Sequence, residues 1–248
     1  MSLHETSCWY SHRVKREVRL SRWGHFGVPV LVFPTAGGDS EEIERWQMIR
    51  AMAPLLGAGR VKIYSCDSVA GQAWFAQEGD LGHRMWVMNQ FQQYVRHEVV
   101  PAIYADCRTD TLPIWTAGAS IGALHAVAMV CRFPDVFHRA LGMSGTYDIL
   151  RFAGADRFTH DYFVSTPLRF VPELSEEDPR LALLRQRFVL LASGEGRAEA
   201  IQESWNMAKV LGERRVPNWV DSWGPSWHHD WETWREMLPK YLAEWTSQ

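Results

Sequence analysis

The sequence predicts an α/β protein whose mostly parallel central sheet is covered by helices on both faces. Short runs of β-branched and aliphatic residues alternate with longer stretches of helical periodicity, and several of the short runs are apolar at every position. Continuously apolar strands are typical of parallel sheets, because both of their faces are buried. The chain has 248 residues, of which 46% are hydrophobic and 22% are charged. These numbers suit one large domain, so we expect a single domain over residues 1–248.

The expected strands are separated by turn signals. Val14–Leu20 alternates apolar and charged positions, which predicts an edge strand. Val28–Phe33 is apolar throughout and predicts a strand buried on both faces. The remaining expected strands are Val61–Ser65, Ile114–Ala117, Ala140–Ser144, Arg187–Ala192 and Asn218–Ser222.

Helices are expected between these strands, where apolar residues recur every three or four positions. They cover Glu41–Leu56, Met85–Tyr104, Ala123–Cys131, Glu199–Leu211 and Trp231–Trp245. Residues 147–180 show no clear period and contain three prolines. We expect an irregular, cap-like insertion there, which would lie over a site.

The composition argues against several classes of function. Lys plus Arg total 26 against 29 for Asp plus Glu, so the net charge of −3 gives no sign of a nucleic-acid partner. No apolar run approaches the roughly 20 residues that would span a membrane. The N-terminus does not have the pattern of a secretory signal, and the four cysteines have neither paired nor metal-type spacing. We therefore expect a cytoplasmic protein with free thiols and no metal or other cofactor. An oligomeric state does not follow from the sequence.

The strongest chemical signal is the segment Gly118-Ala119-Ser120-Ile121-Gly122. It matches the G-x-S-x-G nucleophile elbow of the α/β-hydrolase fold, and it lies between an expected strand and an expected helix. A serine on this sharp turn is lifted above the sheet, and the glycines relieve the crowding that larger residues would cause there. Ser120 is therefore the candidate nucleophile.

A serine hydroxyl needs a base that takes its proton, and in this fold the acid and then the histidine follow the serine along the chain. His228 and His229 lie after the last expected strand and both qualify. The earlier histidines precede the elbow or lie in or beside other expected elements. Adjacent side chains diverge and no third ligand is suitably spaced, so we do not expect this pair to bind a metal.

The acid that orients the histidine is expected after the strand Arg187–Ala192. The candidates in this stretch are Glu195, Glu199 and Glu203, because it contains no aspartate. Asp148, after the preceding strand, is a further candidate.

An oxyanion hole needs two backbone N–H groups. Ile121, directly after the serine, would provide one of them. The turn Pro34–Gly38, after the first buried strand, would provide the other from Thr35 or Ala36. The glycines of this turn allow a close approach of the backbone.

Longer motifs resemble the esterase D-like branch of the α/β-hydrolases, which contains S-formylglutathione hydrolases, feruloyl and acetyl-xylan esterases, and mycolyltransferases. The matching segments span nearly the whole chain. They are Phe33–Gly38, Gly118–Gly122, Phe133–Phe137 with Ser144-Gly145 after it, and His229–Arg235, which has the family's H-x-W-x-x-W pattern.

The resemblance implies that Ser120 is the nucleophile, His229 the base, and Ala36 and Ile121 the oxyanion donors. The formylglutathione hydrolases have an aspartate soon after a glycine at the position of the acid, whereas this chain reads Gly-Glu-Gly-Arg-Ala-Glu over residues 194–199. Glu199 is the first choice for the acid and Glu195 the second.

The resulting expectation is a serine esterase that hydrolyses a small-molecule carboxylic ester through an acyl-enzyme. Two alternatives use the same residues differently: an acyltransferase with the same triad, and a catalytically silent α/β-hydrolase that acts as a binding protein.

Overall fold

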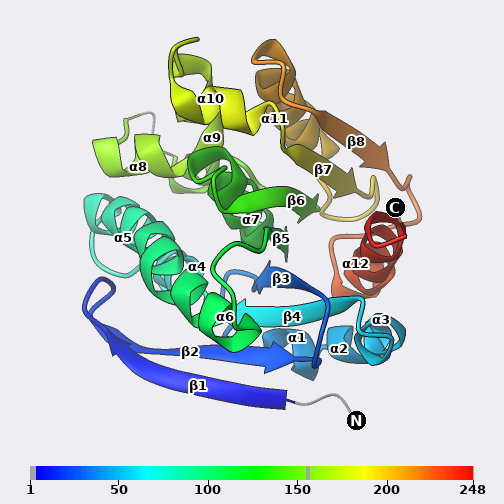
Figure 1. The fold of residues 1–248 in the computed structure, drawn as a ribbon. Coiled ribbons are helices and arrows are strands. Elements are labelled where there is room, and N and C mark those ends of the chain that lie inside the picture. The colour runs from blue at the N-terminus through cyan, green and yellow to red at the C-terminus, as the bar shows by residue number, and fades with distance from the viewer. Residues whose placement is uncertain (1–3, 155–156, 248) are drawn as a thin grey trace.

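The computed structural model describes residues 4–154 and 157–247, in which a single eight-stranded sheet forms the centre of the molecule (Figure 1). The strand order is β1-β2-β4-β3-β5-β6-β7-β8. The strands are β1 (His4–Ser11), β2 (Arg16–Trp23), β3 (Val28–Phe33), β4 (Val61–Cys66), β5 (Ile114–Ala119), β6 (Phe137–Met143), β7 (Phe188–Ser193) and β8 (Asn218–Ser222). From β4 to β8 every neighbouring pair is parallel, whereas β1 and β2 are antiparallel to their neighbours. This arrangement confirms the predicted fold class.

Helices cover both faces of the sheet (Figure 1). One face is covered by α1 (Glu42–Arg45), α2 (Met48–Ala51), α3 (Ala53–Gly57) and α12 (Trp231–Trp245). The other is covered by α4 (Val69–Phe75), α5 (Leu81–Tyr94), α6 (Val100–Cys107), α7 (Ile121–Arg132), α8 (His160–Ser165), α9 (Pro167–Phe170), α10 (Pro179–Leu184) and α11 (Ile201–Glu213). A π-helical segment, η1 (Val95–Val99), joins α5 to α6, and the 3-10 segments are η2 (Ile149–Ala153) and η3 (Val171–Glu173). Within the described residues, none of these helices is both long and apolar enough to cross a membrane.

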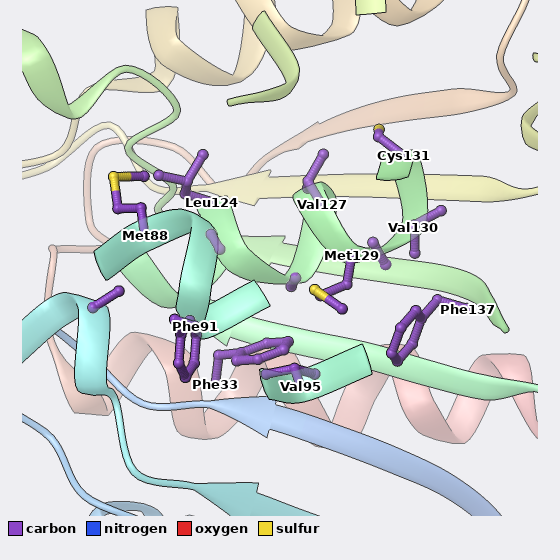
Figure 2. Packing of buried hydrophobic residues seen from close by; sticks show 14 of the residues in the cluster. Phe33, Met88, Phe91, Val95, Leu124, Val127, Met129, Val130, Cys131 and Phe137 are labelled. Atoms are coloured by element: carbon purple, nitrogen blue, oxygen red, sulfur yellow. The ribbon is translucent and has the colours of Figure 1, made fainter. Parts of the chain in front are cut away.

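Strand β3 shows how the sheet separates two hydrophobic cores. Val30 and Val32 pack toward α1–α3 and α12, whereas Leu31 and Phe33 pack toward α5 and α7. Side chains alternate between the faces of a strand, so an apolar residue is needed at every position of a strand buried on both sides. Figure 2 shows the core on the side of α5 and α7, where the rings of Phe33 and Phe91 meet edge to face with their centroids 6.0 Å apart.

The first expected strand is not at the edge of the sheet. Strand β2 covers most of that segment, but it lies between β1 and β4. The edge is formed by β1, which the sequence analysis did not predict. Most of β1 is exposed, so it lacks the buried alternation from which strands are predicted.

Two helical regions also differ from expectation. The helix expected over Glu41–Leu56 is divided into α1, α2 and α3, and Gln47 adopts the left-handed conformation (φ 62°) between the first two. Residues 147–180 are not irregular throughout, because their described positions contain α8, α9, the start of α10 and two 3-10 segments. Part of this region lines the cavity described below.

Candidate active site

Ser120 lies at the turn between β5 and α7, where its backbone adopts φ 57° and ψ −121°. A positive φ is strained for a residue with a side chain and persists where the surroundings enforce it. The two flanking glycines make the turn possible. A Cβ added at Gly118 would collide with the backbone of Gly122, and a Cβ at Gly122 would collide with the carbonyl of Phe33. The predicted strand–turn–helix is therefore present, and its glycines are required by close backbone contacts.

A cavity of about 500 Å³ opens at Ser120. Ala36, Ile121 and His229 also belong to its lining, so the cavity brings together four of the predicted site residues. Its apolar wall is formed mainly by Trp74, Phe75, Ile149 and Phe152. A second cavity, of about 520 Å³, lies against α2 and α3 and is lined by none of the predicted site residues.

The two adjacent histidines have different surroundings. His229 faces the cavity, and its ring meets that of Trp234 edge to face with centroids 5.2 Å apart. His228 does not line the cavity, and its Nδ1 accepts a 2.9 Å hydrogen bond from the backbone N–H of Arg197. Of the pair, His229 is therefore the one that shares a cavity with Ser120.

Glu199 lies on the loop after β7, and its side chain is 1% exposed. Its Oε2 is 3.8 Å from His229 Nδ1, which is within ion-pair distance and longer than a hydrogen bond. The hydroxyls of Ser144 and Ser193 lie 2.6 Å and 3.1 Å from the carboxylate and donate to its two oxygens. Trp234 Nε1–H donates in turn to Ser144 Oγ over 2.9 Å. Side chains from the ends of β6 and β7 and from α12 thus hold the carboxylate beside His229.

These contacts keep Glu199 ionised despite its burial. Burial raises the pKa of the Glu199 carboxyl, but the facing imidazole of His229 and the hydroxyls of Ser144 and Ser193 lower it by more. The net pKa lies below the ordinary value of 4.5. A negative charge is therefore fixed beside His229 at neutral pH.

The other acidic residues considered for this position bind elsewhere. Glu195 is exposed and accepts a hydrogen bond from the hydroxyl of Ser222. Glu203 forms a 2.9 Å ion pair with Arg151. Asp148 is paired with an arginine of α9 and accepts a hydrogen bond from a tyrosine of α8.

The backbone N–H groups of Ala36 and Ile121 have no hydrogen-bond partner among the described residues, and both residues line the cavity. Ile121 is the first residue of α7, whose N-terminal N–H groups have no partner within the helix and favour negative charge. The turn after β3, which contains Ala36, packs closely against α4. Gly71 of α4 allows this contact, because a Cβ on Gly71 would press on the Ala36 carbonyl.

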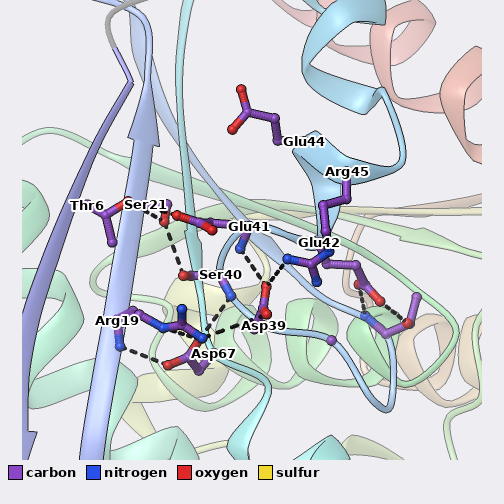
Figure 3. A network of polar contacts seen from close by, with 12 residues as sticks. Thr6, Arg19, Ser21, Asp39, Ser40, Glu41, Glu42, Glu44, Arg45 and Asp67 are labelled. Carbon is purple, nitrogen blue, oxygen red and sulfur yellow. Dashed lines mark hydrogen bonds and ion pairs between the residues drawn. The ribbon is translucent and has the colours of Figure 1, made fainter.

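Two carboxylates fix the turn that follows β3. Glu42 is 6% exposed and accepts hydrogen bonds from Thr35 N–H (2.8 Å) and from the Thr35 hydroxyl (2.6 Å). Burial raises the pKa of Glu42, and the bonds from Thr35 offset only part of this rise. Asp67 accepts 2.9 Å hydrogen bonds from the N–H groups of Ser40 and Arg19, which ties the far end of the turn to β2 (Figure 3).

Sequence reasoning did not anticipate Glu42 as a support of the site or Arg84 and Arg151 as residues of the cavity wall. Acidic residues are common at helix starts because they complement the helix dipole, so Glu42 resembled an ordinary first-turn residue. The arginines come from α5 and η2, which approach Ser120 only in the folded chain. No local spacing could have identified them.

Comparison with known proteins identifies the family of this chain. Residues 58–245 match the Esterase family, which is described as "Putative esterase". A search of curated proteins found no match.

Similar solved structures include a ferulic acid esterase, with a TM-score of 0.76 and 17% identity over 100% of this chain and 98% of that chain. Another is FphF, the Staphylococcus aureus fluorophosphonate-binding serine hydrolase F (TM-score 0.73, 12% identity, 100% and 99% coverage). A third is Mycobacterium tuberculosis MPT51 (FbpC1), with a TM-score of 0.70, 16% identity, and 100% and 99% coverage. At these identities the likeness shows the fold.

The family match covers most of the chain, and the structural neighbours share its fold along their whole length. Together they confirm the resemblance to the esterase D-like branch. The chain belongs to the Esterase family, and it has the α/β-hydrolase fold.

Proposed function

We propose that the protein hydrolyses carboxylic esters through an acyl-enzyme on Ser120, with His229 as general base and Glu199 as the acid partner. Ser120 Oγ attacks the ester carbonyl while His229 takes the hydroxyl proton. The negative charge that develops on the carbonyl oxygen is received by the N–H groups of Ala36 and Ile121. When the tetrahedral intermediate collapses, the C–O bond breaks and the alcohol leaves with the proton from His229.

The second half of the reaction repeats these roles with water. His229 removes a proton from the water molecule that attacks the acyl carbonyl, and it returns the proton to Ser120 as the free acid leaves. The side chain of His229 is 24% exposed, so water can reach it. This access allows the water molecule of deacylation to reach His229.

The observation that carries the proposal is the convergence of three segments at one cavity. The strained Ser120 and His229 line the same cavity, and the buried, ionised Glu199 faces the other side of the imidazole. A carboxylate in this position fixes the ring orientation and stabilises the imidazolium that forms when the serine loses its proton. Glu199 would fill this role in place of the aspartate of the formylglutathione hydrolases.

A panel of 4-nitrophenyl esters with acyl chains of increasing length tests the proposal, with Ser120→Ala as the control. We expect the wild-type protein to release nitrophenol with a burst of about one equivalent, or steadily where deacylation is fast, and the Ser120→Ala protein to release it only at the background rate. A folded wild-type protein that hydrolyses none of the esters would contradict the proposal. So would equal rates for the two proteins.

A further inference from the structure

The cavity at Ser120 has a charge pattern that the hydrolysis of a neutral ester does not require. Two arginines, Arg84 of α5 and Arg151 of η2, belong to its lining, and no aspartate or glutamate of the described residues does. The chain as a whole has a net charge of −3. The cavity wall is thus opposite in sign to the rest of the molecule, and a cleft lined by one sign of charge attracts ligands of the other.

The two arginines differ in their partners. The charge of Arg151 is compensated by the 2.9 Å ion pair with Glu203, a residue outside the cavity lining. Arg84 pairs with no carboxylate among the described residues: its Nε reaches only the carbonyl oxygen of Asp80, at 3.4 Å. Arg84 therefore presents a cation that is free to receive an anion from the substrate.

The surroundings of Arg84 are suited to holding such an anion. Its guanidinium carbon lies 5.3 Å from the ring centroid of Trp74, which is 8% exposed and supports the guanidinium from one side. Phe75 and Phe152 are 75% and 69% exposed, although both belong to the lining. An arginine on an aromatic surface binds carboxylates well, because its planar donors keep a fixed geometry and it is weakly hydrated. The exposed rings would cover the apolar part of the same ligand.

We propose that this esterase selects esters that bear a negative charge, such as a carboxylate, at some distance from the ester bond, and that Arg84 binds this charge. Phe75 and Phe152 would contact the apolar segment between the charge and the reacting carbonyl. The inference rests on the proposed hydrolysis at Ser120 and adds the class of substrate.

Two matched sets of substrates test the inference and show which side of the ester bears the charge. The acyl set is 4-nitrophenyl hexanoate, the mono-4-nitrophenyl ester of adipic acid, and 4-nitrophenyl 6-aminohexanoate. These have six-carbon acyl chains that are neutral, anionic and cationic. The alcohol set compares 4-acetoxybenzoate with phenyl acetate. In each set the readout is the ratio of kcat/KM for the anionic substrate to kcat/KM for the neutral substrate.

Variants of Arg84 connect the ratio to this residue. In at least one set we expect Arg84→Gln to lower the ratio about tenfold, the loss expected for one charge-assisted hydrogen bond. Arg84→Lys should restore part of it, because a lysine keeps the charge without the planar fork. Arg50→Gln is the matched control: it removes the same charge from an exposed position outside this cavity and should leave the ratio unchanged.

The outcomes separate this inference from the proposed function. A wild-type preference for the anionic substrate that Arg84→Gln removes would support the inference. Hydrolysis with no such preference, a preference for the cationic ester, or an anionic preference that survives in Arg84→Gln would overturn it and leave the proposed function standing. Failure to hydrolyse any ester, including the neutral ones, would contradict the proposed function and the inference with it.

Discussion

At the scale of single residues, the hydrogen bonds around Glu199 explain how a carboxylate can remain charged in a nearly water-free position. Burying a charge is unfavourable unless it is paired and hydrogen-bonded. Ser144 donates to Oε1 of Glu199 and Ser193 donates to Oε2, which His229 also faces. The serine hydroxyls thus replace the water that a surface glutamate would bind.

The identity of the acid can be tested by three single amide substitutions. We expect Glu199→Gln to lower kcat by a large factor, because a neutral amide can hold the imidazole in the wrong tautomer. The matching change in a serine protease costs about 10⁴-fold. Glu195→Gln and Asp148→Asn should cost much less, since both carboxylates bind elsewhere in the structure. Steady-state kinetics, with thermal melting of each protein as the control for folding, check this prediction. Near-normal turnover in Glu199→Gln would show the assignment to be wrong.

The lowered pKa of Glu199 also predicts how stability depends on pH. Because this pKa is below 4.5 in the folded chain, the folded state favours the charged form more than the unfolded state does. This stabilisation is present above about pH 4.5, and it is lost as the pH falls through the lowered value. We therefore expect the melting temperature of wild type, measured relative to Glu199→Gln, to decrease as the pH falls from 6 toward 3. A difference that is constant over this range would contradict the prediction.

At the scale of elements, the turn between β3 and α1 is held in place by the carboxylate of Glu42. Thr35 donates two hydrogen bonds to this carboxylate, from its backbone N–H and its hydroxyl. An amide in its place has one acceptor oxygen and one donor NH₂ group, so it does not match the two donors of Thr35. We expect Glu42→Gln to lower kcat about tenfold, because movement of this turn weakens the oxyanion donor that Ala36 provides. The expected loss is smaller than that for complete removal of one oxyanion donor.

Glu41→Gln is the matched control for this prediction. Glu41 is the preceding residue, its side chain is 37% exposed, and its contacts with Thr6 and His4 lie far from Thr35 along the chain. Its substitution should leave kcat nearly unchanged. If the two variants have equal turnover, the support attributed to Glu42 is absent.

The elements that could be predicted are those buried in a regular pattern. The run Val28–Phe33 matches β3, and the expected helix Trp231–Trp245 matches α12. The run Asn218–Ser222 also matches β8, although none of its residues is fully buried. Strand β1 was missed because pairing with β2, rather than burial, holds it in the sheet. The helix expected before β4 is interrupted at Gln47, whose left-handed backbone no local pattern indicated.

The site was predictable where one short segment determines the geometry. The elbow at Ser120 depends on glycines within two residues, so the sequence alone located it. The position of Glu199 depends on Ser144, more than fifty residues away, and on Trp234 in the last helix. Sequence reasoning could therefore offer several acids, and the fold places one of them beside the histidine.

At the scale of the whole molecule, the parallel sheet explains why distant residues meet. Strands β3 to β8 run in one direction, so the turns that follow β3, β5 and β7 lie at the same edge of the sheet. They bring Ala36, Ser120 and Glu199 together there, as is typical of sites in open α/β sheets. The expectation of one domain over residues 1–248 stays a prediction, and the described residues contribute a single sheet to it.

The central claim is that His229 activates Ser120, and covalent labelling with a fluorophosphonate tests it most directly, because only an activated hydroxyl reacts quickly. Intact-mass analysis should show one adduct on the wild-type protein and none on Ser120→Ala. Labelling should be strongly slowed in His229→Ala and close to the wild-type rate in His228→Ala, whose ring accepts a hydrogen bond from Arg197. A folded wild-type protein without an adduct, an adduct that persists in Ser120→Ala, or labelling of His229→Ala at the wild-type rate would contradict the account.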